Sequence, residues 1–145
     1  MATTAIEATA VSGVTTAPAR PVVQISVQPE LGPRHHVALG TSLRKLSEAG
    51  VLIIGSGHMT HNLRDYFTLR AQAGVAQYAS EFRNWVDVRV RERRLEELAD
   101  WNVQAPSALR AHPSAEHFLP LFVALGAAGD HYATHTVYAG FDGPL

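Results

Sequence analysis

The sequence of 145 residues contains no cysteine. This absence excludes disulfide bonds, a thiolate nucleophile and any metal bound through thiolates. No run approaches the roughly 18 consecutive apolar residues that a membrane-spanning helix needs, so no membrane partner is expected. The sequence also has no excess of charge of either sign. Its 12 basic and 13 acidic residues give a formal net charge of −1, which indicates no nucleic-acid partner. We therefore expect a globular protein of the cytoplasm.

Histidine is the residue type present in unusual number, with 8 copies. In a chain without cysteine, a bound metal must be held by imidazole and carboxylate groups, a ligand set that suits iron, zinc or manganese. Histidines are also common on surfaces and at helix ends. The neighbours of each histidine in the sequence therefore decide which of them are candidates for chemistry.

The first 20 residues differ in composition from the rest of the chain. They are rich in alanine, threonine and valine, with no aromatic residue and no basic residue before Arg20, which predicts a disordered tail over residues 1–20. This segment lacks the positive start of a secretory signal and the arginines of a mitochondrial transit peptide. Residues 21–145 are then one domain's worth of chain.

An alternation of strands and helices is predicted within 21–145. Segments 21–28 and 51–54 are rich in β-favouring residues, and the pattern between them predicts a helix over 33–48. A strand, a helix and a strand in this order form a βαβ unit, whose crossover is nearly always right-handed and whose strands are parallel. We therefore predict an α/β fold, a partly parallel sheet flanked by helices.

Further elements are predicted in the second half of the chain. A long helix is expected over 75–100, with arginine and glutamate residues interleaved on a solvated face, then a break over 101–104. Short helices follow, one over 106–111 and one capped by Ser114, which places Glu116 and His117 in the first turn of an apolar helix. A last strand is predicted over 134–139.

Two stretches concentrate polar residues of catalytic type. The predicted strand 51–54 runs into Gly55-Ser56-Gly57, and His58 and His61 follow directly. In α/β folds ligands bind beyond the carboxyl ends of strands, so this loop is the natural place for chemistry. The second stretch, 112–122, adds a carboxylate and two more histidines. We expect His61 and His117 to converge on one cavity.

These motifs resemble those of the class III extradiol ring-cleavage dioxygenases, in the DOPA-dioxygenase-like branch of the LigB superfamily. The resemblance covers residues 20–145 and follows the order of the family's C-terminal half. The residues that carry it are Gly55-Ser56-Gly57 with Thr60-His61-Asn62-Leu63-Arg64, Glu116-His117-Phe118-Leu119-Pro120-Leu121 with Leu125-Gly126-Ala127, and, more weakly, Pro21-Val22-Val23-Gln24-Ile25-Ser26-Val27-Gln28.

The resemblance implies cleavage of a small aromatic diol by O₂ at a divalent metal, Fe(II) or Zn(II). His61 then occupies the position of the catalytic acid–base and His117 that of a metal ligand. Glu116 either orients an imidazole, as carboxylates commonly do, or is an acidic residue favoured in a first helical turn. Ser56, His58 and Asn62 are expected to line the substrate pocket, as the substrate-binding residues.

The remaining histidines are expected to be structural. His35 and His36 are adjacent on a predicted helix and point about 100° apart, so they cannot face one ligand; a place at the pocket rim is the alternative. His112 precedes a proline and is interpreted as a boundary residue. His131 and His135 are four residues apart, but the β-branched residues around them argue against a helical metal pair.

The sequence also departs from the family. Two metal-binding histidines of the family lie in Gly-His-Gly and Ser-Ala-His-Trp motifs, which are absent here. One ligand does not make a site, which ordinarily needs three. The first interpretation is therefore a dioxygenase half, clipped at its C-terminus, that works with a complementary N-terminal half or in a homo-oligomer. The second is a non-catalytic or vestigial accessory protein. The third is a small α/β ligand-binding domain whose Gly-Ser-Gly loop holds an anion.

Overall fold

The computed structural model describes residues 7–8, 21–69 and 75–140. The helix predicted over 33–48 is present as α1 (Gly32–Glu48), preceded by the 3-10 turn η1 (Pro29–Leu31). Proline suits the first turn of α1, where a backbone N–H would have no helical acceptor. After the helix, Gly50 takes a φ of +91°, a left-handed conformation that ends the helix and that glycine adopts without strain.

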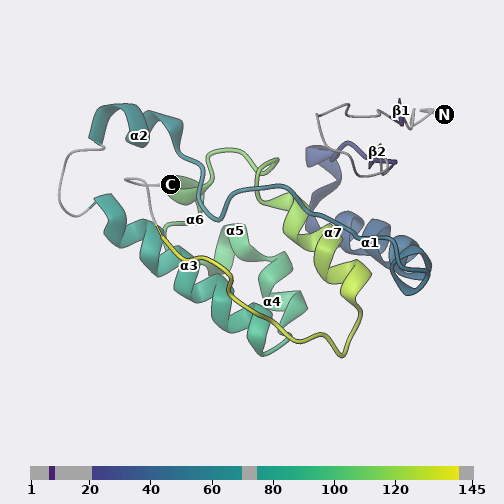
Figure 1. Cartoon of the computed structure of the whole chain (residues 1–145). Coiled ribbons are helices and arrows are strands. Elements are labelled where there is room, and N and C mark those ends of the chain that lie inside the picture. The colour runs from purple at the N-terminus through teal and green to yellow at the C-terminus, as the bar shows by residue number, and fades with distance from the viewer. Residues whose placement is uncertain (1–6, 9–20, 70–74, 141–145) are drawn as a thin grey trace.

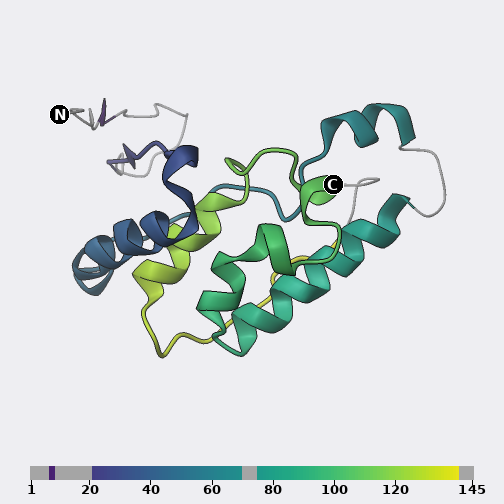
Figure 2. The same ribbon diagram turned by 180° about the vertical axis from the view of Figure 1, so that it is seen from behind.

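Helices α1 and α7 (Leu119–Ala128) pack along each other, and both views show them side by side (Figures 1 and 2). A glycine on each helix allows this approach. A Cβ added to Gly40 would overlap the carbonyl oxygen of Val123, and one added to Gly126 would overlap the carbonyl oxygen of Val37. The two backbones therefore touch directly, at a distance that only glycine permits.

The predicted helix over 75–100 is wrong in its second part. The structure has α3 (Val75–Arg91) and a separate α4 (Leu95–Ala99), because Arg93 adopts a left-handed φ of +58° between them. The predicted break over 101–104 is the short helix α5 (Trp101–Gln104). This reversal of the chain returns Trp101 to the core beside α3.

The core lies between α3 and α7. Four buried aromatic side chains make edge-to-face contacts with centroids 5.3 to 6.1 Å apart, the arrangement that aromatic rings prefer: Phe82, Trp101, Phe118 and Phe122. The short helix α6 (Ala108–Ala111) covers one end of this cluster with small buried residues. The core is therefore built from helices, and no sheet contributes to it in the described part of the chain.

Helix α7 begins later than predicted. Ser114 does not cap it, because α7 starts at Leu119 and Glu116 and His117 lie in the turn before it. Pro120 explains the start, since proline lacks an N–H and fits only the first turn of a helix. His117 is consequently held by a turn whose backbone is free to accept hydrogen bonds from another segment.

The partly parallel sheet is not shown in the described residues. They contain two strands of two residues each, β1 (Glu7–Ala8) and β2 (Val23–Gln24), which pair antiparallel. Segments 51–54 and 134–139, predicted as strands, form no ladder there, because no neighbouring strand supplies backbone partners. Leu52 and Ile54 are 79% and 74% exposed. The predicted tail over 1–20 lies outside the described residues, apart from β1.

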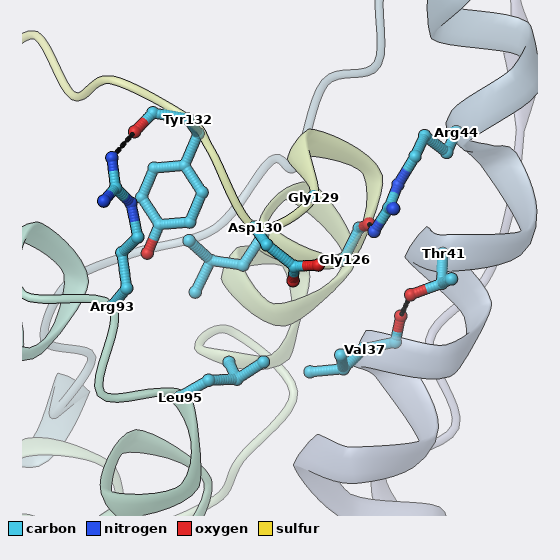
Figure 3. Close-up of a pocket in the computed structure, with 10 residues that line it drawn as sticks. Val37, Thr41, Arg44, Arg93, Leu95, Gly126, Gly129, Asp130 and Tyr132 are labelled. Carbon is cyan, nitrogen blue, oxygen red and sulfur yellow. Dashed lines mark hydrogen bonds between the residues drawn. The ribbon is translucent and has the colours of Figure 1, made fainter.

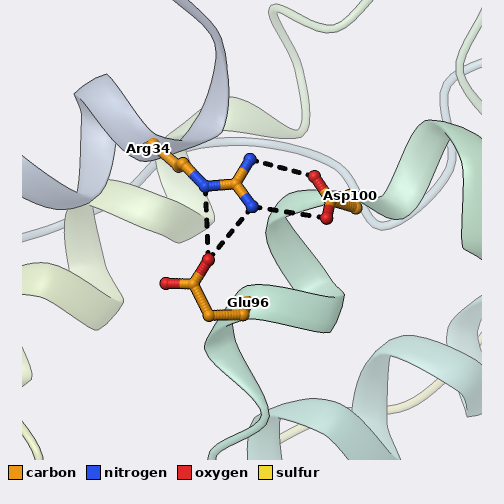
Figure 4. A network of polar contacts seen from close by, with 3 residues as sticks. All are labelled: Arg34, Glu96 and Asp100. Atoms are coloured by element: carbon orange, nitrogen blue, oxygen red, sulfur yellow. Dashed lines mark hydrogen bonds and ion pairs between the residues drawn. The ribbon is translucent and has the colours of Figure 1, made fainter.

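The interleaved arginines and glutamates form exposed ion pairs, as predicted: Arg94 lies 2.7 Å from Glu92 and 3.5 Å from Glu97. Arg34 on α1 donates to Asp100 and to Glu96, with nitrogen–oxygen distances of 2.9 and 3.0 Å (Figure 4). All three side chains are well exposed, so these ion pairs orient the helices more than they stabilise them. Across the described ranges, we find no helix long and apolar enough to cross a membrane.

Candidate active site

The Gly-Ser-Gly loop lies directly on the turn that precedes α7. A Cβ added to Gly55 would overlap the carbonyl oxygen of Pro120, and one added to Gly57 would overlap that of His117. Glycine at both positions is therefore required for close packing of backbone on backbone. The loop presents its glycines to carbonyl oxygens, which is an unfavourable lining for the anion site of the third interpretation.

Backbone hydrogen bonds then fix the loop beside the second stretch. The His58 N–H donates to the His117 carbonyl at 2.8 Å, and the His61 N–H donates to the Ala111 carbonyl at 2.7 Å. These two bonds join residues that are 59 and 50 positions apart in the sequence. They explain why two histidine-bearing stretches meet although neither belongs to a sheet.

Asn62 secures the far end of the loop. Its side-chain amide donates to the Arg110 carbonyl at 2.7 Å, and its side-chain oxygen accepts the Asp65 N–H at 3.0 Å. The second bond caps the first turn of α2 (Leu63–Leu69). Asn62 is only 6% exposed, so its observed contacts are structural, and its predicted contact with substrate stays a prediction.

Three imidazoles come together at this junction. The rings of His61 and His117 have centroids 3.6 Å apart and planes tilted by 34°, a stacked arrangement. His58 lies 5.1 Å from His61 and 6.0 Å from His117, measured between centroids. The expected convergence of His61 and His117 is therefore observed, whereas their chemical roles remain predictions.

The surroundings of His61 favour its neutral form. Its pKa is lowered first by burial and next by the positive charge that His117 and His58 carry when protonated, while Glu116 acts in the opposite direction. The Nδ1 atom of His61 is buried without a hydrogen-bond partner among the described residues. A neutral imidazole carries one unprotonated nitrogen, so His61 can accept a proton at neutral pH.

Glu116 is held by its neighbour Ser114 rather than by an imidazole. The Ser114 hydroxyl donates to Glu116 Oε1 at 2.7 Å, and this bond is the main reason that the pKa of Glu116 is lowered. The same oxygen is 3.7 Å from His117 Nε2, which is beyond hydrogen-bonding distance. Orientation of an imidazole by Glu116 therefore stays a prediction.

An open cleft of about 600 Å³ adjoins the stacked pair. This volume lies in the range of small-molecule sites. It is lined by His61, Asn62, Leu63, Arg64, Asp65, Leu109, Pro113, Ser114, Glu116 and His117. Ser56 is exposed and does not line it, and His58 reaches the site only through its contacts with the other two rings.

Arg64 is a cleft residue to which the sequence interpretation assigned no role. It is exposed and makes no ion pair with any described residue, whereas Arg110 beside the cleft is bound to Asp65 at 2.8 Å. Within the part of the chain that the structure describes, no carboxylate neutralises the Arg64 guanidinium, which is therefore a candidate contact for an anionic ligand. Its position directly after the His61-Asn62-Leu63 motif was the only signal in the sequence.

A second hollow, of about 160 Å³, lies between α1, α7 and the segment that follows α7 (Figure 3). Arg44 and Arg93 approach it from opposite sides, and Arg93 donates to the Tyr132 carbonyl at 2.8 Å. None of the predicted site residues lines it. The candidate site is therefore the cleft at the histidine pair.

The other predicted structural histidines are also accounted for. His36 is fully buried, its Nδ1 donates to the Gly32 carbonyl at 2.6 Å, and its Nε2 accepts the Gln28 N–H at 3.1 Å. His36 therefore fastens η1 to α1. His35 contacts the Gln28 side chain at the surface, and His131 and His135 are exposed.

The described residues do not fit a complete metal site. Among them no group of three or more histidine, aspartate, glutamate or cysteine side chains is arranged to hold a metal ion. His117 with Glu116 can supply part of a ligand set, and two ligands are short of the usual three.

Comparison with known proteins identifies the class. The family described as "Catalytic LigB subunit of aromatic ring-opening dioxygenase" matches residues 11–144, nearly the whole chain. The chain therefore belongs to the LigB family, as its motifs predicted.

Three relatives are similar at about 40% identity, and each is named 4,5-DOPA dioxygenase extradiol. The protein of Beta vulgaris is 41% identical over 125 residues, 86% of this chain and 46% of the relative. That of Portulaca grandiflora is 42% identical over 84% of this chain and 45% of the relative, and that of Mirabilis jalapa 40% over 81% and 43%. The chain thus spans less than half the length of the curated relatives it matches.

Proposed function

We propose that this chain is the catalytic-histidine part of an extradiol ring-cleavage dioxygenase, which opens a catechol-type ring with O₂ at a non-haem divalent metal, Fe(II) or Zn(II). The observation that carries the proposal is the stacked pair of His61 and His117 beside an open cleft. Family membership supports the same chemistry. The proposed location is the cytoplasm, as expected from the sequence.

His61 is the acid–base residue of this reaction. Extradiol cleavage requires a base that takes a proton from a hydroxyl group of the diol and later returns it to the ring-opened product. Burial and the neighbouring imidazoles keep His61 neutral and ready to accept that proton. His117 contributes one ligand to the metal, and Glu116 secures the turn on which His117 lies.

The remaining ligands come from a second polypeptide equivalent to the family's N-terminal half. This is the split-enzyme interpretation, and the incomplete ligand set of the described residues supports it. The same polypeptide supplies strand partners for the exposed segment 51–54, so that the partly parallel sheet forms in the complex. A homo-oligomer is the alternative, in which a second copy would have to provide ligands that this sequence lacks.

The substrate is a catechol that carries a carboxylate. Three relatives are named for DOPA, which is such a molecule. Arg64 lines the cleft without an acidic partner among the described residues and binds the carboxylate of the side chain. Asn62 lines the same cleft, whereas the predicted contacts of Ser56 and His58 with the substrate stay predictions, because neither residue lines it.

The vestigial interpretation is the second candidate, favoured by the same incomplete ligand set. The deciding experiment measures iron and zinc binding and catechol turnover by the purified chain, alone and with a polypeptide that carries Gly-His-Gly and Ser-Ala-His-Trp motifs. The split enzyme predicts weak metal binding alone, then stoichiometric metal and ring cleavage in the mixture. A mixture that binds metal without cleaving any catechol would establish the vestigial protein, and tight stoichiometric binding by the chain alone would refute the missing-ligand explanation.

A further inference from the structure

His112 is buried in the aromatic core and yet reaches the histidine-bearing loop. It is 1% exposed, and its ring centroid lies 5.0 Å from that of Phe118 and 5.7 Å from that of Trp101. Its Nε2 is 2.9 Å from the carbonyl oxygen of Met59. A carbonyl oxygen only accepts hydrogen bonds, so the assignment that satisfies this contact puts the proton on Nε2.

The bond to Met59 is the one side-chain hydrogen bond of His112 among the described residues. Nδ1 of His112 is buried and has no hydrogen-bond partner among the described residues. Burial also lowers the pKa of His112 to about 4, so the ring is neutral at ordinary pH and keeps one tautomer. Burial of the imidazole in an apolar cluster with one nitrogen unpaired costs free energy, and the hydrogen bond from His112 to the loop offsets part of that cost.

Met59 lies between His58 and His61, so a bond to its carbonyl acts on both of them. We propose that His112 is a positioning residue, whose Nε2–H holds the Met59 carbonyl and fixes the loop of His58 and His61 against the turn of His117. The backbone bonds from His58 and His61 lie on either side of this bond, at 2.8 and 2.7 Å. The importance of His112 for catalysis rests on the function proposed above, whereas its effect on the loop does not.

The test measures amide hydrogen exchange by NMR in the full chain, without metal or substrate. The His58 and His61 amides report on the loop, because their protons donate to the His117 and Ala111 carbonyls. An interior amide of α7, such as that of Leu125, reports on the core. H112F keeps an aromatic ring but has no donor, and we expect it to lower loop protection roughly three- to tenfold, the factor for one hydrogen bond.

H112Q is the rescuing variant, because its terminal amide nitrogen can reach the position of Nε2, and we expect protection close to that of the wild type. F82L is the matched control: it loosens the same cluster without touching the bond to Met59, so core protection falls but the loop changes no more than the core. If H112F fails to fold, H112N replaces it, since its amide is one carbon too short. Equal loop protection in H112Q and in H112F or H112N, or a loss in F82L as large as in H112F, would overturn the proposal.

Discussion

The imidazole rings of His61 and His117 are stacked, with 3.6 Å between their centroids. At this separation protonation of one ring opposes protonation of the other, and the charge on His117 is, after burial, the next cause of the lowered pKa of His61. Any positive charge placed on His117 therefore keeps His61 neutral. The pair thus couples the state of one histidine to the basicity of the other.

Replacing His61 and replacing His117 should have different effects on turnover and on metal content. In the complemented enzyme, H61A should lower turnover by roughly 10²- to 10⁴-fold, the usual contribution of a general acid–base group, and leave metal content unchanged. H117A should lose both turnover and metal. Steady-state assays and metal analysis of the same preparations measure the two effects. Full activity of H61A would remove His61 from its proposed role.

Acid should destabilise the protein through His112. Its pKa falls from 6.5 in the unfolded chain to about 4 in the folded one, so between these values the unfolded chain binds more protons. The stabilisation is complete above pH 6.5 and is lost as the pH falls toward 4, by at most about 3 kcal/mol. Urea unfolding between pH 7 and pH 4.5 measures this loss. H112Q cannot titrate, and a pH dependence in H112Q as steep as that of the wild type would contradict the assignment.

The glycines of the loop should not tolerate a side chain. G57A places a Cβ against the carbonyl oxygen of His117, and relief of this overlap moves the loop away from the turn. We expect G57A to lower the free energy of unfolding by about 1–3 kcal/mol, the range for overpacking. S56A is the matched control, because Ser56 is exposed and lies next to Gly57 in the same loop. Unfolding midpoints of G57A and S56A that agree within error would show that the close approach does not matter.

Arg64 should discriminate among substrates. In the complemented enzyme, R64Q should raise KM for a catechol with a carboxylate about tenfold or more, since a charge-assisted contact is lost, and should leave KM for unsubstituted catechol nearly unchanged. R34Q is the control, because Arg34 is an exposed arginine that pairs with Glu96 and Asp100 and does not line the cleft. An equal rise for both substrates in R64Q would assign Arg64 a structural role.

Local signals in the sequence were sufficient for α1 and for the meeting of the two histidines. Pro33 and Gly50 mark the limits of α1, and the order of the two motifs predicted that His61 and His117 converge. Both outcomes depend on residues close in sequence or on a motif that requires a shared site. The predicted sheet could not be judged from local signals in this way. A β-strand forms only when a neighbouring strand supplies hydrogen-bond partners, and segment 51–54 has no such neighbour among the described residues.

Some details of the structure could not be predicted from the sequence, because they depend on contacts between distant segments. The left-handed Arg93 that divides α3 from α4, and the bond from His112 to Met59, both depend on how distant segments pack. A histidine before a proline was interpreted as a boundary, since the sequence does not reveal which carbonyl a buried ring will face. Arg64 was named within a motif, but only the cleft distinguishes it from other surface arginines.

The uncovered segment 51–54 also affects how long the protein survives in a cell. Leu52 and Ile54 are 79% and 74% exposed on a β-favouring stretch that pairs with no strand among the described residues. Such a stretch invites self-association and attracts chaperones and proteases. If the proposed second polypeptide covers this stretch, any surplus of the chain over that polypeptide should be degraded or should aggregate.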